Sequence, residues 1–249
     1  MNQGLSQLTG VTIVNYGTIN MCMPPTLQVP YTINKPLPKP KPIEDAPEGG
    51  VKRKKPISKK DHAQHVVETK DIIEKNKETL QKWTGKSEFS LIYDSDVDGL
   101  NAYGINRCVC EKRNVMIIVI TYNKYVFGSF TSLPIPTSQK QDEWVKDDKK
   151  HFAFTLVNPS KTEPMKFDHV PTVKDSLVIS PSNSKKWVVA VLAFFGIKQD
   201  DSSYIAAEFT DTYQVPTGIT SDLFVGSHHP DTFPVTKVVA LKWSNKKAK

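Results

Sequence analysis

The sequence predicts a β-rich α+β domain, an antiparallel two-sheet sandwich with a few flanking helices, behind a long N-terminal tail. Short runs of β-branched and aromatic residues dominate from residue 88 onward, with polar or turn-forming residues between them. The run at residues 115–120 is apolar on both faces, which is typical of a central strand. Prolines mark the tail, because half of the 18 in the chain lie within residues 1–57. Such a composition has little to bury and favours disorder.

The predicted tail, residues 1–57, is both proline-rich and basic. Proline alternates with leucine and lysine at residues 36–42, which favours an extended polyproline II conformation. That segment fits a stiff solvated spacer, and a ligand of an SH3-type domain is the alternative. The formal net charge of +7 is uneven, because residues 1–60 carry +6 and residues 241–249 carry +4, whereas residues 61–240 carry −3. General attraction to polyanions is therefore expected from the two ends.

A dense basic cluster closes the tail. Its position beside proline in a flexible segment fits capture by a nuclear import receptor or contact with phosphate groups, and a solubilising charge run is the alternative. No helix-turn-helix, zinc finger or basic zipper accompanies it, so no base-specific reading of DNA is predicted. The cluster consists of Lys52, Arg53, Lys54, Lys55, Lys59 and Lys60.

The cysteines and the hydropathy of the sequence bear on the cellular compartment. Three cysteines without framework spacing favour reduced thiols in the cytoplasm or the nucleus. The N-terminus shows no secretory signal pattern, and no apolar run approaches ~18 residues, so membrane insertion is not expected. Cys108 and Cys110, two positions apart, would share one face of a strand, and a redox pair is a minor alternative to structural thiols.

A leading helix is predicted over residues 58–85. Val66, Ile73 and Leu80 recur at seven-residue spacing, Trp83 extends the same face, and Gly85 ends the helix. The pattern covers only about three heptads, so we expect the helix to lie on the domain rather than to form a coiled coil.

The stretch Asp94-Ser-Asp-Val-Asp-Gly99 has the spacing of the first half of a calcium loop. An EF-hand loop also needs a bidentate glutamate at its twelfth position, which is Ile105 here, and a helix before it. Residues 88–93 are instead typical of a strand. The sequence therefore predicts an acidic turn whose carboxylates cap backbone N–H groups.

The predicted elements of the domain follow one another closely. A tight hairpin connection is expected at residues 122–124, a short helix at 100–108 and a charged surface loop at 132–150. The strands are expected at residues 88–93, 115–121, 125–131, 151–157, 177–180, 187–195, 204–209 and 235–243.

The order of these pieces resembles the TLDc domain family over roughly residues 66–244, with the sandwich itself at 86–244. The matching segments are residues 89–99, 115–120, 125–132, 151–156 and 238–243. The family has a glycine-rich tract in its second half, whereas residues 200–209 contain no glycine. The resemblance therefore does not imply that this chain has a partner-binding surface built on that tract. The resemblance implies structural roles for Trp83, Asp94, Asp98, Gly99, Phe127, Gly128, Phe152, Phe154 and Trp243.

The resemblance also implies a function. It implies a protein without a cofactor or an established catalytic mechanism, acting in oxidative-stress resistance through protein contacts. The implied partner is the vacuolar proton pump or a regulatory complex. The alternative is a nuclear DNA-binding regulator of stress-responsive genes, with nucleic acid held by the basic tail.

A TLDc-like enzyme is the last-ranked hypothesis. Its candidate groups are Ser227, His228, His229 and Asp231, together with Cys108 or Cys110. The sequence has no G-x-S-x-G or H-E-x-x-H motif and no phosphate-binding glycine loop. Adjacent histidines in an extended segment point to opposite faces, so the pair is poorly placed to bind one metal ion. We therefore expect no enzyme.

Overall fold

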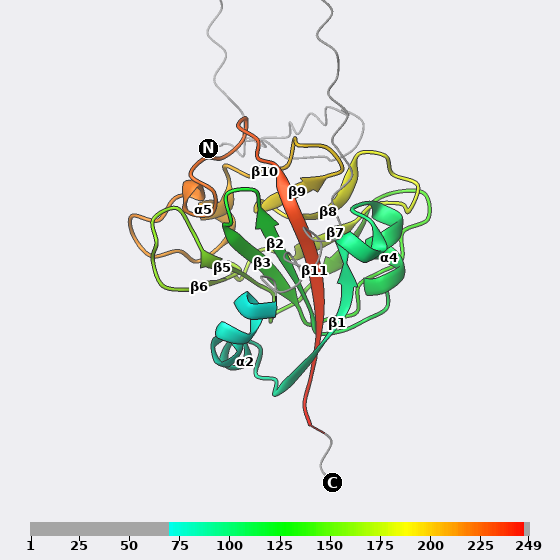
Figure 1. Cartoon of the computed structure of the whole chain (residues 1–249), viewed down its shortest axis with the longest axis horizontal. Helices are drawn as coiled ribbons and strands as arrows, with labels where there is room; N and C mark the ends of the chain where they lie inside the picture. The colour runs from blue at the N-terminus through cyan, green and yellow to red at the C-terminus, as the bar shows by residue number, and fades with distance from the viewer. Residues whose placement is uncertain (1–69, 247–249) are drawn as a thin grey trace, which may run out of the picture. The chain divides into compact units, whose positions relative to one another are not determined.

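The computed structural model describes residues 70–246 (Figure 1). The proline-rich tail, the basic cluster and the start of the leading helix lie outside the described residues. Residues 70–75 are helical, and α2 (Lys77–Thr84) follows after a break at Asn76. The helix ends as predicted at Gly85, whose φ of 64° is a left-handed conformation that glycine adopts without a steric penalty.

The larger of two antiparallel sheets has six strands in the order β1-β11-β2-β3-β5-β6. Every residue of β2 and β3 is buried, as expected for central strands. In Figure 1 the C-terminal strand β11 runs through this sheet between β1 and β2. The strands are β1 (Glu88–Asp94), β2 (Val115–Thr121), β3 (Val126–Thr131), β5 (Phe152–Val157), β6 (Met165–Asp168) and β11 (Val235–Ser244).

The second sheet has five strands in the order β10-β9-β8-β7-β4. Its strands are β4 (Glu143–Lys146), β7 (Asp175–Ile179), β8 (Trp187–Val191), β9 (Phe195–Lys198) and β10 (Tyr204–Ile205). Four short helical segments complete the described chain: α3 (Ser95–Asp98), α4 (Ala102–Val109), α5 (Phe209–Thr212) and the 3₁₀ helix η1 (Ser221–Leu223). The predicted β-rich, two-sheet antiparallel architecture with few helices is confirmed.

Aromatic side chains dominate the core between the sheets. Phe127 of β3 lies within 5.7–5.9 Å of four phenylalanine rings, measured between ring centroids. These rings come from the β8–β9 turn, the start of β9 and segments after α5, so one residue of the larger sheet joins distant parts of the chain. The four rings are Phe194, Phe195, Phe224 and Phe233.

A second core covers the outer face of the larger sheet. Trp83 of α2 lies 6.3 Å from the ring of Phe152 and 6.0 Å from that of Phe154, and Trp243 of β11 packs on Phe89 at 5.1 Å. Gly128 makes this packing possible, because a Cβ there would lie 2.0 Å from the Ile117 carbonyl oxygen and 2.7 Å from the Phe154 ring. The leading helix therefore lies on the domain, as predicted.

Several element predictions were wrong in detail. Residues 187–195 form a hairpin rather than one strand, because the chain reverses after Val191, where Phe194 donates its N–H to the Val191 carbonyl and Ala193 has a φ of 49°. The expected loop at 132–150 contains β4, the expected strand at 204–209 has only two strand residues, and β6 and α3 were not predicted.

Candidate functional site

The acidic turn is a compact, internally capped structure. An Asp94 carboxylate oxygen accepts the Asp96 N–H at 3.0 Å and caps α3, while Asp98 accepts the Asp94 N–H at 3.0 Å. The Tyr93 hydroxyl donates to the Gly99 carbonyl at 2.9 Å. Carboxylates cap backbone N–H groups here as predicted, although the turn also contains the one-turn helix α3.

Cations of the protein neutralise these carboxylates. The Lys237 ammonium lies 2.9 Å from a carboxylate oxygen of Asp94 and 2.9 Å from one of Asp96, and its side chain is only 2% exposed. Arg107 of α4 pairs with Asp98. The twelfth position of the hypothetical calcium loop, Ile105, is fully buried in the core. The structure therefore agrees with the rejection of an EF-hand.

Lys237 was missed by sequence reasoning. The only signal was a lysine directly before the apolar residues 238–241 of the segment that became β11. The neighbouring Val238 donates its N–H to the Ser95 hydroxyl at 3.0 Å, across 143 positions of sequence. These contacts attach the acidic turn to β11, which explains why a turn so polar is held rigidly against the sandwich.

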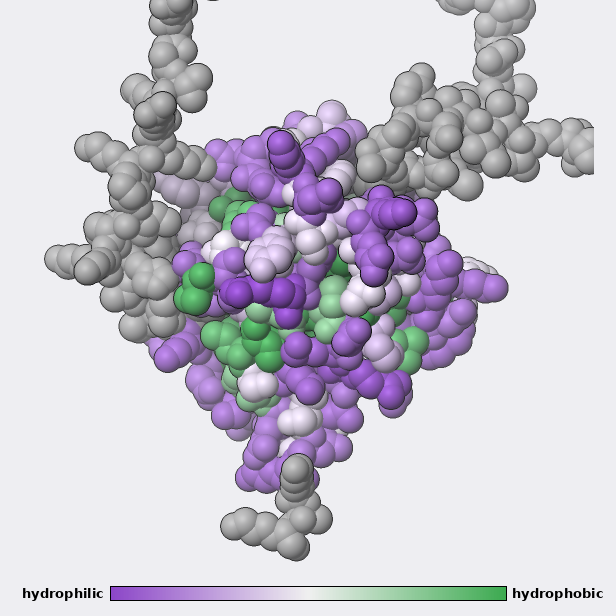
Figure 2. Space-filling model, turned by 90° about the vertical axis from the view of Figure 1, so that its right-hand side faces the viewer, coloured by the Kyte–Doolittle hydropathy of each residue, from purple (hydrophilic) through white to green (hydrophobic). Residues whose placement is uncertain are grey.

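An apolar surface overlies this network. Leu91 of β1, Val97 of α3 and Tyr103 of α4 are 50%, 72% and 63% exposed, and the three elements contact one another. Figure 2 views the molecule from the side where α4 lies in Figure 1, and hydrophobic side chains gather there between hydrophilic ones. We call Leu91, Val97 and Tyr103 the apolar patch. Apolar side chains that are exposed together, rather than singly, are characteristic of interaction sites.

Comparison with known proteins decides the family. A model of the TLDc domain matches residues 62–232. The chain belongs to the TLDc family. No curated protein matches it. The matched segment stops before β11, yet β11 pairs with both β1 and β2, so the fold of this TLDc domain includes a strand beyond the match.

The candidate catalytic residues between 227 and 231 contact partners both outside and within their own set. The His228 Nδ1 lies 2.6 Å from an Asp222 carboxylate oxygen, and the His229 ring packs on Tyr204 at 5.2 Å. The Asp231 N–H donates a hydrogen bond to the His228 carbonyl oxygen at 3.0 Å. Within residues 70–246, no hydrogen bond joins these groups to Cys108 or Cys110.

The two described cysteines are free thiols, and they do not share a strand face. Cys108 lies in α4 and Cys110 caps its end, where residues two positions apart point in different directions. Burial raises the pKa of the Cys108 thiol, and Asp98 raises it further. Burial and Glu111 raise the pKa of Cys110. Both groups therefore favour the protonated thiol, which is the less reactive form.

A second polar cluster, also missed from sequence, lies where β5 begins and β6 ends. The His151 Nε2 is 3.0 Å from the Tyr213 hydroxyl, and the His169 ring lies 4.4 Å from the His151 ring. Burial lowers the pKa of His151 well below its usual value, and His169 lowers it further. Burial also lowers the pKa of His169 to about 4, against the opposing effect of Asp148 and Asp168. Both imidazoles are therefore neutral near pH 7.

Two further findings concern metal binding and membrane-spanning helices in the described residues. Between residues 70 and 246, no three or more His, Cys, Asp and Glu side chains are grouped so that they could hold a metal ion. No helix in the same range is long and apolar enough to cross a membrane.

Lys237→Met is expected to destabilise the domain by about 3–5 kcal/mol, because it leaves two largely buried carboxylates without a cation. Urea unfolding followed by circular dichroism measures the change. Lys242→Met, on an exposed position of the same strand, should stay within about 0.5 kcal/mol of the wild type. Adding Asp96→Asn to Lys237→Met should recover part of the loss. Equal stability of the Lys237 and Lys242 variants would contradict the ion-pair interpretation.

Stability should fall on acidification before most carboxylates titrate. Because His151 and His169 have lower pKa values folded than unfolded, the unfolded chain binds protons first as the pH drops below about 6.5. Their contribution is fully present above that pH, and that of His169 is lost as the pH approaches about 4. Urea midpoints at pH 7.5, 6 and 5 measure this. His169→Gln should flatten the dependence of the urea midpoint on pH, and His228→Gln is the matched control. If the two variants show the same pH dependence as the wild type, the interpretation of His169 is wrong.

Proposed function

We propose that this TLDc protein is a non-catalytic interaction protein of the oxidative-stress response, acting through protein–protein contacts. The observation that carries the proposal is the apolar patch, because Val97 and Tyr103 are each more than half exposed on a surface that the Lys237 ion pairs attach to β11. Burying such side chains against a partner is favourable by roughly 25 cal/mol per Å² of apolar area.

The use of the polar groups supports a non-catalytic role. Asp94 and Asp96 neutralise Lys237, Asp98 pairs with Arg107, and His228 pairs with Asp222. A general base must lie within hydrogen-bond reach of the group that it deprotonates, and the hydrogen bond of His228 within the described residues goes to Asp222 rather than to a serine or cysteine. The raised pKa values of both thiols also speak against cysteine nucleophiles.

The family suggests the kind of partner. We propose the vacuolar proton pump or a regulatory complex, met in the cytoplasm, in the nucleus or in both. The residues 200–209, where the family has its glycine-rich tract, here form the short β10 and the approach to α5. This difference directs attention to the apolar patch around β1, α3 and α4 as the contact surface.

Changing the patch should remove the partner without unfolding the domain. In affinity capture from cells with and without peroxide, we expect Val97→Asp and Tyr103→Asp to recover at least about tenfold less of the proteins that the wild type retains. Tyr122→Asp is the matched control, because Tyr122 is 73% exposed in the β2–β3 turn, a connection that carries none of the patch residues. Thermal unfolding confirms folding, and equal recovery by all three variants would remove the patch from the proposal.

A nuclear DNA-binding regulator is the second candidate, and the basic cluster at residues 52–60 favours it. A tagged chain should be at least partly nuclear, and changing Lys52, Arg53, Lys54 and Lys55 to Ala should move it to the cytoplasm. If the chain binds DNA, deletion of residues 1–60 should weaken that binding and flatten its dependence on salt. An unchanged distribution after the four substitutions would remove the import signal from the proposal.

A further inference from the structure

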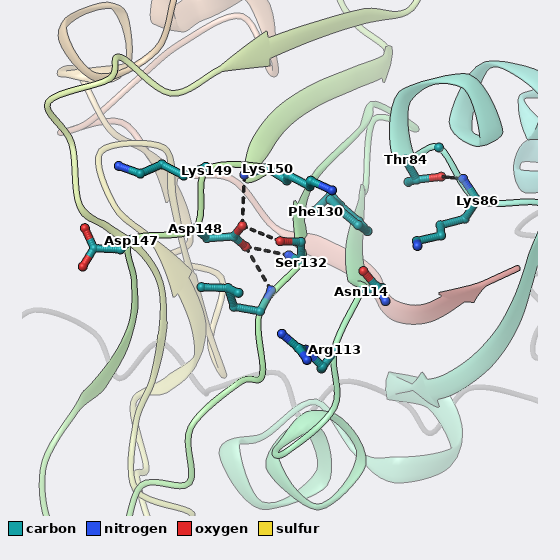
Figure 3. Close-up of a pocket in the computed structure, with 12 residues that line it drawn as sticks. Thr84, Lys86, Arg113, Asn114, Phe130, Ser132, Asp147, Asp148, Lys149 and Lys150 are labelled. Atoms are coloured by element: carbon teal, nitrogen blue, oxygen red, sulfur yellow. Dashed lines mark hydrogen bonds between the residues drawn. The ribbon is translucent and has the colours of Figure 1, made fainter.

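A pocket opens where four connections of the TLDc domain meet, and its lining residue Asp148 also acts on the pKa of His169 in the neighbouring histidine cluster. The connections are those between α2 and β1, between α4 and β2, between β3 and β4, and between β4 and β5. Its volume of about 520 Å³ lies within the range of small-molecule sites. Figure 3 shows the side chains that line it.

The pocket has an excess of positive charge. Its lining includes four cationic side chains, Lys86, Arg113, Lys149 and Lys150, and two carboxylates, Asp147 and Asp148. In Figure 3 the ends of Lys86, Arg113 and Lys150 point toward one common space beside Asn114, whereas Lys149 and Asp147 extend away from it. None of these cations forms an ion pair with another residue of the described range. Like charges that converge without a counterion favour an anionic ligand.

Asp148 is hydrogen-bonded to backbone and hydroxyl groups and forms no ion pair with the cations of the lining. One oxygen accepts the N–H groups of Ser132 at 2.6 Å and Leu133 at 3.3 Å. The other accepts the Ser132 hydroxyl at 2.5 Å and the Lys150 N–H at 3.1 Å. The side chain of this buried aspartate therefore fixes the β4–β5 connection against the end of β3, and so places Lys150 at the pocket.

The chemistry of the lining narrows the ligand class. Phe130, an aromatic residue of the lining, is only 2% exposed and stacks on Phe152, so it offers no free face to a nucleobase. Three converging cations of different reach, one of them an arginine that can hold two oxygens at once, suit several phosphate groups on a compact scaffold. We propose that this pocket binds a small polyanion carrying at least two phosphate groups, either free or as the headgroup of a lipid. This site is independent of the proposed protein contacts.

Adjacent lysines provide the sharpest test. Lys150 and Lys149 are neighbours with the same charge, but only Lys150 points into the pocket. In calorimetric titration of the full chain with inositol 1,4,5-trisphosphate, Lys150→Glu and Arg113→Glu should each weaken binding at least tenfold. Lys149→Glu should weaken it less than threefold. Thermal unfolding of each variant checks the fold, which these exposed positions should leave intact.

The basic tail needs its own control, because it also attracts polyanions. Binding should persist when Lys52, Arg53, Lys54 and Lys55 are changed to Ala. Sedimentation with phosphatidylcholine vesicles, with and without phosphatidylinositol 4,5-bisphosphate, separates the two sources of ligand. Binding to the free headgroup alone assigns a soluble ligand, and Lys150-dependent binding to the loaded vesicles assigns a lipid. No binding of either probe, equal loss in the Lys149 and Lys150 variants, or loss on changing the tail alone would overturn the proposal.

Discussion

The ion pairs of Lys237 with Asp94 and Asp96 are the constraint on which the proposed contact surface depends. Removing an ammonium group from water costs several kcal/mol, and two carboxylate oxygens at 2.9 Å must compensate for it. A strand without these partners would expose the lysine or would not form. The end of β1, the helix α3 and the start of β11 are therefore fixed together, and Val97 of the apolar patch is carried on the segment that they hold.

Sequence patterns predicted those elements that depend on residues close together in the chain. The apolar run of β2, the hairpin to β3 and the glycine that ends α2 each follow from residues that are neighbours in sequence. The hairpin of β8 and β9 was missed because both of its strands and its turn are apolar, so no polar residue marks the reversal. The polar clusters were missed for another reason. Lys237 meets partners about 140 positions away, and His151 meets Tyr213 62 positions away. No spacing rule connects such residues.

The pocket shows that local sequence patterns also fail to predict where charged side chains gather. Residues 61–240 carry a net charge of −3, which indicates a folded part without general attraction for polyanions. Yet Lys86, Arg113 and Lys150, on three separate connections, converge on one space. Their fields add only there, since exposed charges are screened beyond about 8–10 Å at physiological salt. The net charge of a segment therefore predicts its long-range attraction for polyanions but not a local binding site. A binding site depends on which loops the fold brings together.

The protonated thiols bear on how a TLDc protein of this kind would act in oxidative stress. Peroxide reacts with thiolates, and the raised pKa values of Cys108 and Cys110 keep both groups in the less reactive form. Their neighbours are set by the fold, since Asp98, which raises the pKa of Cys108, is held by Arg107 and by the backbone of Asp94. Within the described domain, a direct oxidation switch at these cysteines is therefore disfavoured. A response to oxidants would then come through what the domain binds, and two of the three residues of the apolar patch, Val97 and Tyr103, lie on the same α3–α4 segment as Cys108.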